Sequence, residues 1–169
     1  MSLVENEQNF LKFYDENITK IYRYVYFRVG SQEVAQDLAS EAFLKGWQYL
    51  KEGNFIGNLS AMTYQICRNL ISDYFRKNPN LPITLEEVSE KHLGIAESGI
   101  EEKTDKNLKI DRIMEYLRLI REEYQEIIIW YYVDDFEVEE IAQILGKSEG
   151  TVRTSLSRAI KALREALEA

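Results

Sequence analysis

The sequence predicts an all-α protein: two small helical domains joined by a flexible acidic linker, the C-terminal one a helix-turn-helix. Three observations favour this fold class. Apolar residues recur at spacings of three and four in both flanks of the chain, as on one face of a helix. Between the flanks this periodicity stops, and both prolines of the chain lie there. No stretch has the strict apolar–polar alternation that is typical of a half-buried strand.

The interruption in the middle of the chain is also where its charge is concentrated. The 169 residues carry a net charge of −8, and residues 86–105 contain seven acidic residues but only two lysines. Prolines, glycines and an acidic excess without helical spacing are typical of a linker. We therefore expect a linker at 78–105, an N-terminal domain at 1–77 and a C-terminal domain at 106–169.

The N-terminal domain is predicted to contain three helices, at about 7–29, 32–50 and 59–76. Gly30 and Ser31 separate the first two, because glycine favours the position after a helix and serine favours the N-cap. The first helix is indicated by eight apolar residues at helical spacing: Phe10, Phe13, Tyr14, Ile18, Ile21, Tyr22, Val25 and Val29. In the third helix, five residues are expected to face the core: Ala61, Ile66, Leu70, Ile71 and Tyr74.

The C-terminal domain is predicted to contain four shorter helices, at about 107–119, 122–133, 138–145 and 149–167. Each domain is small, so each has a thin hydrophobic core. Both domains are therefore expected to depend partly on binding partners for rigidity.

The last two helices have the spacing of a helix-turn-helix. Ala142 is small where the second helix crosses the first, and Gly146 ends the first helix in a positive-φ conformation. Ser148 is placed to cap the second helix, and Val152 is its buried anchor. Three further residues are expected to complete this small core: Ile141, Leu145 and Leu156.

The second helix of this motif is a candidate for DNA binding. The acidic balance of the whole chain argues against nucleic acid, but residues 147–164 hold five cations against one acid. Arginine can fork onto guanine, and hydroxyl groups suit phosphates and base edges. An ordinary helical hairpin with a solvated basic face is the alternative, and the capped turn and local charge favour DNA. The candidate residues are Lys147, Ser148, Thr151, Arg153, Thr154, Ser155, Ser157, Arg158 and Lys161.

Several classes of function are excluded by composition. One cysteine and one histidine leave no disulfide framework, Cys-based zinc site or His pair, and no glycine-rich phosphate loop is present. We therefore expect no enzyme, metal or cofactor. The longest apolar run, 127–133, is too short for a membrane helix, and the first residues lack a secretory signal. These features predict a cytoplasmic protein, in which Cys67 is a small buried hydrophobic residue.

Two surfaces of the N-terminal domain each allow two interpretations. On the second helix, a stripe opposite the apolar one is either a solvated acidic face or a docking surface for a basic protein: Asp37, Ser40, Glu41 and Leu44. On the third helix, aromatic and cationic residues also allow two interpretations. Either they contact single-stranded nucleic acid, or the tyrosines belong to the core and the cations are solvated. These residues are Tyr64, Arg68, Asn69, Tyr74, Arg76 and Lys77. Periodicity does not separate these interpretations.

Three segments together resemble a known family, the extracytoplasmic-function (ECF) subfamily of bacterial RNA polymerase sigma factors. The first is similar to the family's polymerase-binding helix, the second to its promoter-melting helix and the third to its upstream-element domain. Their order and the two-domain layout match the subfamily over nearly the whole chain outside the linker. The segments are AQDLASEAFLKGWQYL (35–50), MTYQICRNLISDYFRK (62–77) and EEYQEIIIWYYVDDFEVEEIAQILGKSEGTVRTSLSRAIKALRE (122–165).

The resemblance implies a factor that binds core RNA polymerase, recognises promoter DNA and helps to open it, without chemistry of its own and without a small-molecule substrate. It implies duplex DNA and the unpaired non-template strand as ligands, and an anti-sigma factor as a partner. The stripe on the second helix falls at the family's polymerase contact, and the candidate residues of the last helix at its upstream-element contact. The residues that fall at the downstream element and the melted strand are Asn54, Phe55, Asn58, Met62, Arg68, Asn69, Asp73 and Arg76.

The chain departs from the family pattern at several positions. Met62-Thr63 stands where the family usually has Trp-Leu, so strand opening has less stacking surface. Ile120-Arg121 replaces a Leu-Pro pair before a helix. Ser155 and Ser157 stand where arginine and histidine are frequent, which implies a different base preference. Two alternatives remain: a stand-alone helix-turn-helix regulator that binds duplex DNA as a dimer, and a sigma mimic that acts through protein contacts alone.

Overall fold

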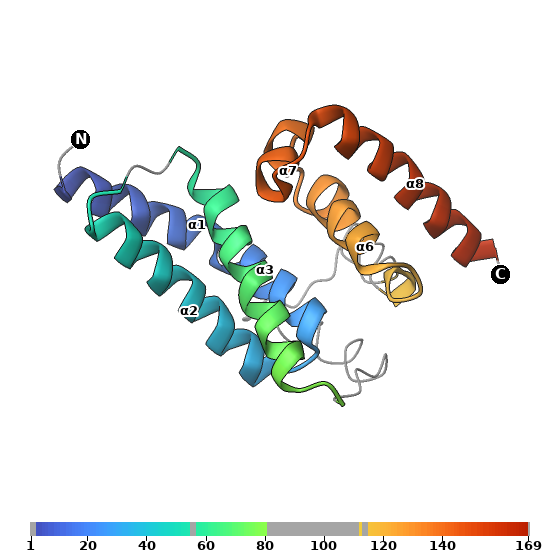
Figure 1. Ribbon diagram of the computed structural model, residues 1–169, viewed down its shortest axis with the longest axis horizontal. Helices are drawn as coiled ribbons and strands as arrows, with labels where there is room; N and C mark the ends of the chain where they lie inside the picture. The colour runs from blue at the N-terminus through green and yellow to red at the C-terminus, as the bar shows by residue number, and fades with distance from the viewer. Residues whose placement is uncertain (1–2, 55–56, 81–111, 113–114, 169) are drawn as a thin grey trace, which may run out of the picture. The chain divides into compact units, whose positions relative to one another are not determined.

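The computed structural model describes residues 3–54, 57–80, 112 and 115–168, and the described segments are helices joined by short loops (Figure 1). The chain divides into two compact units, Met1–Ile83 and Thr84–Ala169. The all-α fold class is thereby confirmed. The acidic linker falls mostly within 81–111, outside the described residues, and the finer domain boundaries stay a prediction.

The first unit begins with two helices whose junction follows the predicted signals. Helix α1 spans Leu3–Val29, and α2 spans Gln32–Lys51. Gly30 has φ +74°, and the Ser31 hydroxyl accepts a hydrogen bond from the Val34 backbone N–H at 3.3 Å. The chain therefore reverses here because a left-handed glycine is followed at once by a capped helix start.

Aromatic rings hold the helices of the first unit together. Phe10 packs against Phe43, with ring centres 6.3 Å apart, and this joins α1 to α2. Helix α3, Leu59–Lys77, is joined to α1 by the edge-on contact of Tyr24 with Tyr64 at 5.3 Å. Burial of such side chains stabilises a fold by about 1.5–3 kcal/mol each. Tyr64 is fully buried. Of its two interpretations, a contact with single-stranded nucleic acid or a core residue, the structure therefore supports the core residue.

The inward faces of α1 and α3 differ in part from the predicted ones. Ile66 and Tyr74 are half-exposed rather than buried, and Tyr14 is exposed. Consecutive residues near the end of α1 are all buried, because both α2 and α3 pack against this helix. They are Tyr24, Val25, Tyr26 and Phe27.

The second unit contains the predicted helix-turn-helix. Its elements are α6 (Glu122–Ile128), the π-helix η1 (Ile129–Val133), α7 (Val138–Leu145) and α8 (Glu149–Glu168). The prediction of one helix over 122–133 is therefore correct only up to Ile128. The next five residues are wound as a π-helix, whose last bond joins the Asp134 N–H to the Ile129 carbonyl oxygen at 2.9 Å. Of the helix expected at 107–119, the described residues 112 and 115–117 are helical.

The turn between α7 and α8 has the expected geometry. Gly146 is left-handed, with φ +66°, and the Ser148 hydroxyl accepts from the Thr151 N–H at 3.1 Å. Val152 is fully buried, as predicted. Two of the expected core residues, Leu145 and Leu156, are only half-buried. Ile141 and Ile144 lie deeper, since α8 and η1 both pack against α7.

Candidate functional site

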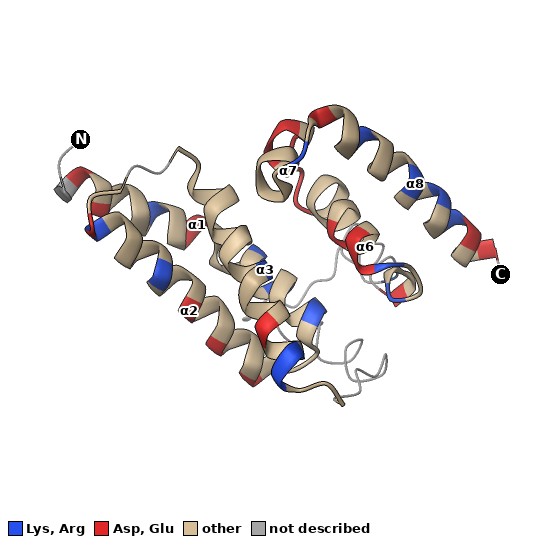
Figure 2. Ribbon diagram, in the orientation of Figure 1, with Lys and Arg blue, Asp and Glu red and all other residues tan. Residues whose placement is uncertain are grey.

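The outward face of α8 carries most of the candidate DNA-binding residues in an exposed position. The turn presents Lys147 and Ser148, and all of the candidates except half-exposed Ser155 are exposed. Figure 2 shows cations along the length of this helix. An exposed cationic face on the second helix of a helix-turn-helix is the geometry that enters a major groove. The exposed members are Thr151, Arg153, Thr154, Ser157, Arg158 and Lys161.

One cation of this face is ion-paired to an acid of the same helix. The Nη2 atom of Arg153 lies 3.2 Å from Oε1 of Glu149, and both side chains are more than half exposed. Glu149 belongs to the first turn of α8. The i, i+4 spacing of Glu149 and Arg153 is a signal in the sequence by which this pair could have been found.

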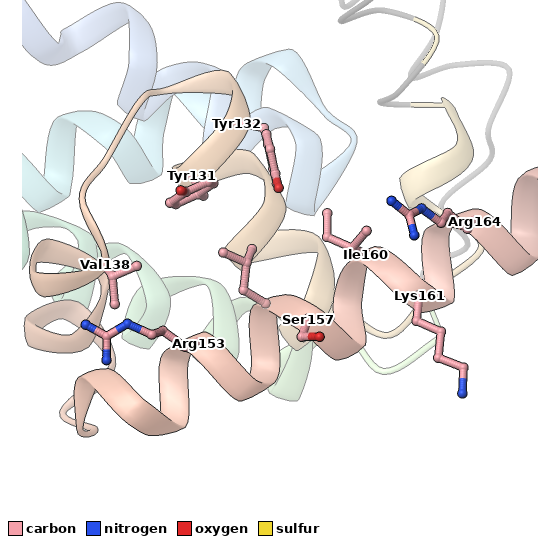
Figure 3. A pocket seen from close by; sticks show the side chains of 9 residues that line it. Tyr131, Tyr132, Val138, Arg153, Ser157, Ile160, Lys161 and Arg164 are labelled. Carbon is pink, nitrogen blue, oxygen red and sulfur yellow. The ribbon is translucent and has the colours of Figure 1, made fainter.

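A groove of about 620 Å³ lies beside this helix, between η1, the start of α7 and α8 (Figure 3). Tyr132, which is 50% exposed, belongs to its wall. The sequence of the apolar run 127–133 does not indicate that Tyr132 is exposed, because the orientation of its side chain depends on the π-helical winding of η1. The groove combines apolar and cationic side chains: Tyr131, Tyr132, Val138, Arg153, Leu156, Ser157, Ile160, Lys161 and Arg164.

The stripe on α2 is exposed along its whole length. Asp37, Ser40, Glu41 and Leu44 are all exposed, and Leu44 is 54% accessible. Figure 2 shows acidic positions repeating along the outer side of this helix. Glu41 also pairs with Lys45 at 3.6 Å, in an exposed i, i+4 contact that contributes a few tenths of a kcal/mol. The stripe is thus an accessible acidic surface with a large apolar residue within it.

The candidate residues at the start of α3 are partly engaged in local structure. The Asn58 side chain accepts from the Ala61 N–H at 3.0 Å and so caps α3. The Asn54 amide donates to the Tyr49 carbonyl oxygen at 3.0 Å. Met62 is half-exposed, and Phe55 lies outside the described residues. Asn58 therefore has a structural role whatever else it contacts.

Farther along α3, the candidate residues share one accessible side. Asn69 and Arg76 are exposed, while Arg68 and Asp73 are half-exposed. Arg76 and Asp73 form an ion pair with each other. This pair lowers the charge that Arg76 offers to a phosphate.

Cys67 lies on the opposite, buried side of α3, as expected. Burial raises the pKa of its thiol to about 12, so the side chain is a neutral hydrophobic group at physiological pH. Within the part of the chain that the structure describes, no group of acids, histidines and cysteines could hold a metal ion. In the same residues, no helix is long and apolar enough to span a bilayer.

Known protein families match both units. Residues 13–79 match the family described as sigma-70 region 2, and residues 110–163 match the family described as sigma-70, region 4. The first match begins within α1 and extends past the end of α3, and the second ends within α8.

Curated relatives match along most of the chain. The ECF RNA polymerase sigma factor BldN of Streptomyces coelicolor is 29% identical over 99% of this chain and 65% of its own length. The ECF RNA polymerase sigma factor SigW of Bacillus subtilis is 28% identical, over 88% of this chain and 83% of its own. The chain thus spans about two thirds of one relative and more of the other.

A solved structure has the same fold. It is the sigma factor RpoE from Bartonella quintana, in complex with the anti-sigma factor NepR, with a TM-score of 0.68. The likeness covers 96% of this chain and 98% of RpoE at 21% sequence identity.

Proposed function

Since the chain belongs to the ECF subfamily of the sigma-70 RNA polymerase sigma factors, we propose that it binds core RNA polymerase and directs it to promoters. Proteins of this family are transcription initiation factors and not enzymes. The polymerase performs the chemistry, and this chain selects the site. We place this action in the bacterial cytoplasm, where the polymerase meets DNA.

The proposal divides the work between the two units. The α2 stripe of Asp37, Ser40, Glu41 and Leu44 docks on the polymerase, and α8 reads the duplex upstream. Met62 and the polar side of α3 then hold unpaired non-template bases, together with the loop before α3. Because these contacts exist only with separated strands, they shift the equilibrium toward open DNA. For the two domains we keep the boundaries predicted from the sequence, 1–77 and 106–169.

One observation carries the DNA-binding part of this proposal. Helix α8 starts at a capped turn and presents exposed cations in a chain with a net charge of −8. Such a local patch is too small to hold duplex DNA tightly on its own, because non-specific affinity grows with the number of phosphates neutralised. Free protein is therefore expected to bind promoters poorly, and holoenzyme to bind them well. An anti-sigma factor is the expected regulator, as NepR is found with RpoE.

The test is a reconstituted transcription assay with bacterial core polymerase. Wild type is compared with an Asp37→Lys, Glu41→Lys double variant by core-binding titration and run-off transcription. Reversing two charges in a docking surface is expected to weaken core binding at least about 10-fold. Transcription from discrete start sites should then fall in parallel.

A charge-matched control separates docking from net charge. Asp15 and Glu16 are also exposed acids, on α1, and an Asp15→Lys, Glu16→Lys variant has the same change in charge. It should bind core polymerase within about 2-fold of wild type. If wild type ignores core polymerase yet binds duplex DNA alone, the chain acts as a stand-alone regulator and the proposal fails.

A further inference from the structure

The acid that pairs with Arg153 lies at the end of α8 that a helix-turn-helix inserts into DNA. Recognition helices contact base edges mainly through their N-terminal residues. Glu149 is in the first turn of α8, one helical turn before Arg153, and its Oε1 lies 3.2 Å from the Arg153 Nη2. It is also the one acid among residues 147–164.

A carboxylate at this position repels the phosphates of a duplex, whatever its sequence. It approaches the phosphates together with the cations, and its repulsion subtracts from the affinity that they supply. An acid here is therefore costly for a helix whose role is simply to attract DNA. The ion pair of Glu149 with Arg153 suggests a role for this acid that compensates for its repulsion of phosphates.

The pairing changes what Arg153 can do. A free arginine has five N–H donors on a long side chain, and it can grip any phosphate as readily as it forks onto guanine. The carboxylate of Glu149 engages one guanidinium nitrogen, neutralises the charge locally and leaves the remaining donors available. Arg153 and Val138 both belong to the wall of the groove (Figure 3).

We propose that Glu149 is a positioning residue that makes Arg153 read a base rather than a phosphate. Glu149 thus lowers the affinity of α8 for DNA in general and raises its discrimination at one base pair. This inference rests on the proposed function, since it concerns the promoter that the holoenzyme selects.

The experiment uses the holoenzyme on promoter templates whose upstream element is randomised. Transcribed templates are sequenced for wild type, Arg153→Ala, Glu149→Gln and Glu165→Gln. The Arg153→Ala profile identifies the base pair that this arginine reads. A well-placed arginine–guanine contact discriminates by roughly 10- to 100-fold. Glu149→Gln is expected to reduce discrimination at that same base pair at least about 5-fold, with the other positions unchanged.

A second readout separates positioning from a structural role. With Arg153 freed for a phosphate, Glu149→Gln should bind non-specific duplex more tightly. The slope of log affinity against log salt should also steepen by about 0.9. A variant that merely weakened the start of α8 would lose affinity and discrimination together, which thermal unfolding would reveal.

The control carries the same charge change on the same helix. Glu165 is exposed and lies sixteen residues beyond Glu149, about 24 Å along the helix axis. Glu165→Gln should keep the wild-type base profile. The inference is overturned if Glu149→Gln and Glu165→Gln give the same profile and slope, or if Glu149→Gln lowers affinity for every sequence. If the wild-type holoenzyme selects no upstream sequence at all, the proposed function itself fails.

Discussion

Gly46 on α2 faces Met62 on α3 so closely that a Cβ at position 46 would lie 3.1 Å from the Met62 Cε. The helix proposed to dock on the polymerase and the helix proposed to hold unpaired DNA thus pack closely at this point. Met62 is half-exposed, and its methyl group is the end of a flexible side chain that can move by a few tenths of an ångström.

Gly46→Ala is therefore expected to stabilise the protein. Alanine is better than glycine in a helix by about 1 kcal/mol, and part of this gain offsets the shift of Met62. We expect the unfolding free energy to rise by about 0.5 kcal/mol in urea titrations. Gly46→Leu should lower it by about 1–3 kcal/mol, because Phe10 also lies against this position. A loss of stability in the alanine variant would mean that Met62 cannot yield.

Two equally exposed leucines separate docking from general surface hydrophobicity. Leu44 in the α2 stripe is 54% exposed, and Leu11 on α1 is 56% exposed. Leu44→Ala should weaken binding to core polymerase about 10-fold, as for an apolar anchor in an interface. Leu11→Ala should change it less than about 2-fold. Competition for fluorescently labelled holoenzyme measures both, and equal effects would argue against a docking role of the stripe.

The buried thiol makes stability depend on pH in the alkaline range. Burial raises the pKa of Cys67 from 9.0 to about 12, so the folded state keeps its proton where the unfolded chain has lost it. The contribution of the protonated Cys67 thiol to the unfolding free energy is complete below pH 9.0 and is lost as pH rises to about 12.

Within that window, Cys67 should lower the unfolding free energy by about 1.4 kcal/mol per pH unit. A Cys67→Ala variant, compared with wild type by urea unfolding above pH 9.0, should lack this slope. Parallel curves for the two proteins would contradict the prediction. Native Cys67 should also react with thiol reagents far more slowly than the unfolded chain.

Backbone strain is stored between η1 and α7. Among the described residues, Asp135 is the one non-glycine with positive φ, at +58°. Asp135→Gly is expected to stabilise the protein by about 0.5–1 kcal/mol, and Asp135→Val to destabilise it by about 1–2 kcal/mol. Asp135→Asn should stay within about 0.5 kcal/mol, since asparagine tolerates this conformation. Thermal unfolding of the three variants checks the order.

The two serines Ser148 and Ser157 on the recognition motif should separate folding from DNA binding. Ser148 caps α8, and its hydroxyl also donates to the Thr151 Oγ1 at 2.8 Å. Ser148→Ala should cost about 1 kcal/mol of stability. Ser157 is exposed on α8, and Ser157→Ala should change stability by less than about 0.5 kcal/mol while weakening transcription from upstream-dependent promoters. A Ser148→Ala variant as stable as wild type would show that the cap contributes nothing.

Two junctions between helices were predictable because their causes are local. Gly30, Ser31, Gly146 and Ser148 act on residues three or four positions away, so the junctions between α1 and α2 and between α7 and α8 follow from the chain itself. The fold class, the helix-turn-helix and the exposed α2 stripe follow in the same way from periodicity.

Burial of individual rings was decided by the tertiary structure. Tyr64 is fully buried against Tyr24, whereas Tyr132 is exposed, although both lie in apolar helical surroundings in the sequence. Which side of a helix is covered depends on neighbours far along the chain, and the π-helical winding of η1 turns its residues out of the register that an α-helix would give. The sequence by itself thus determined the junctions between α1 and α2 and between α7 and α8, and the charges that the helices carry. Packing between helices decided which side chains remain available to bind.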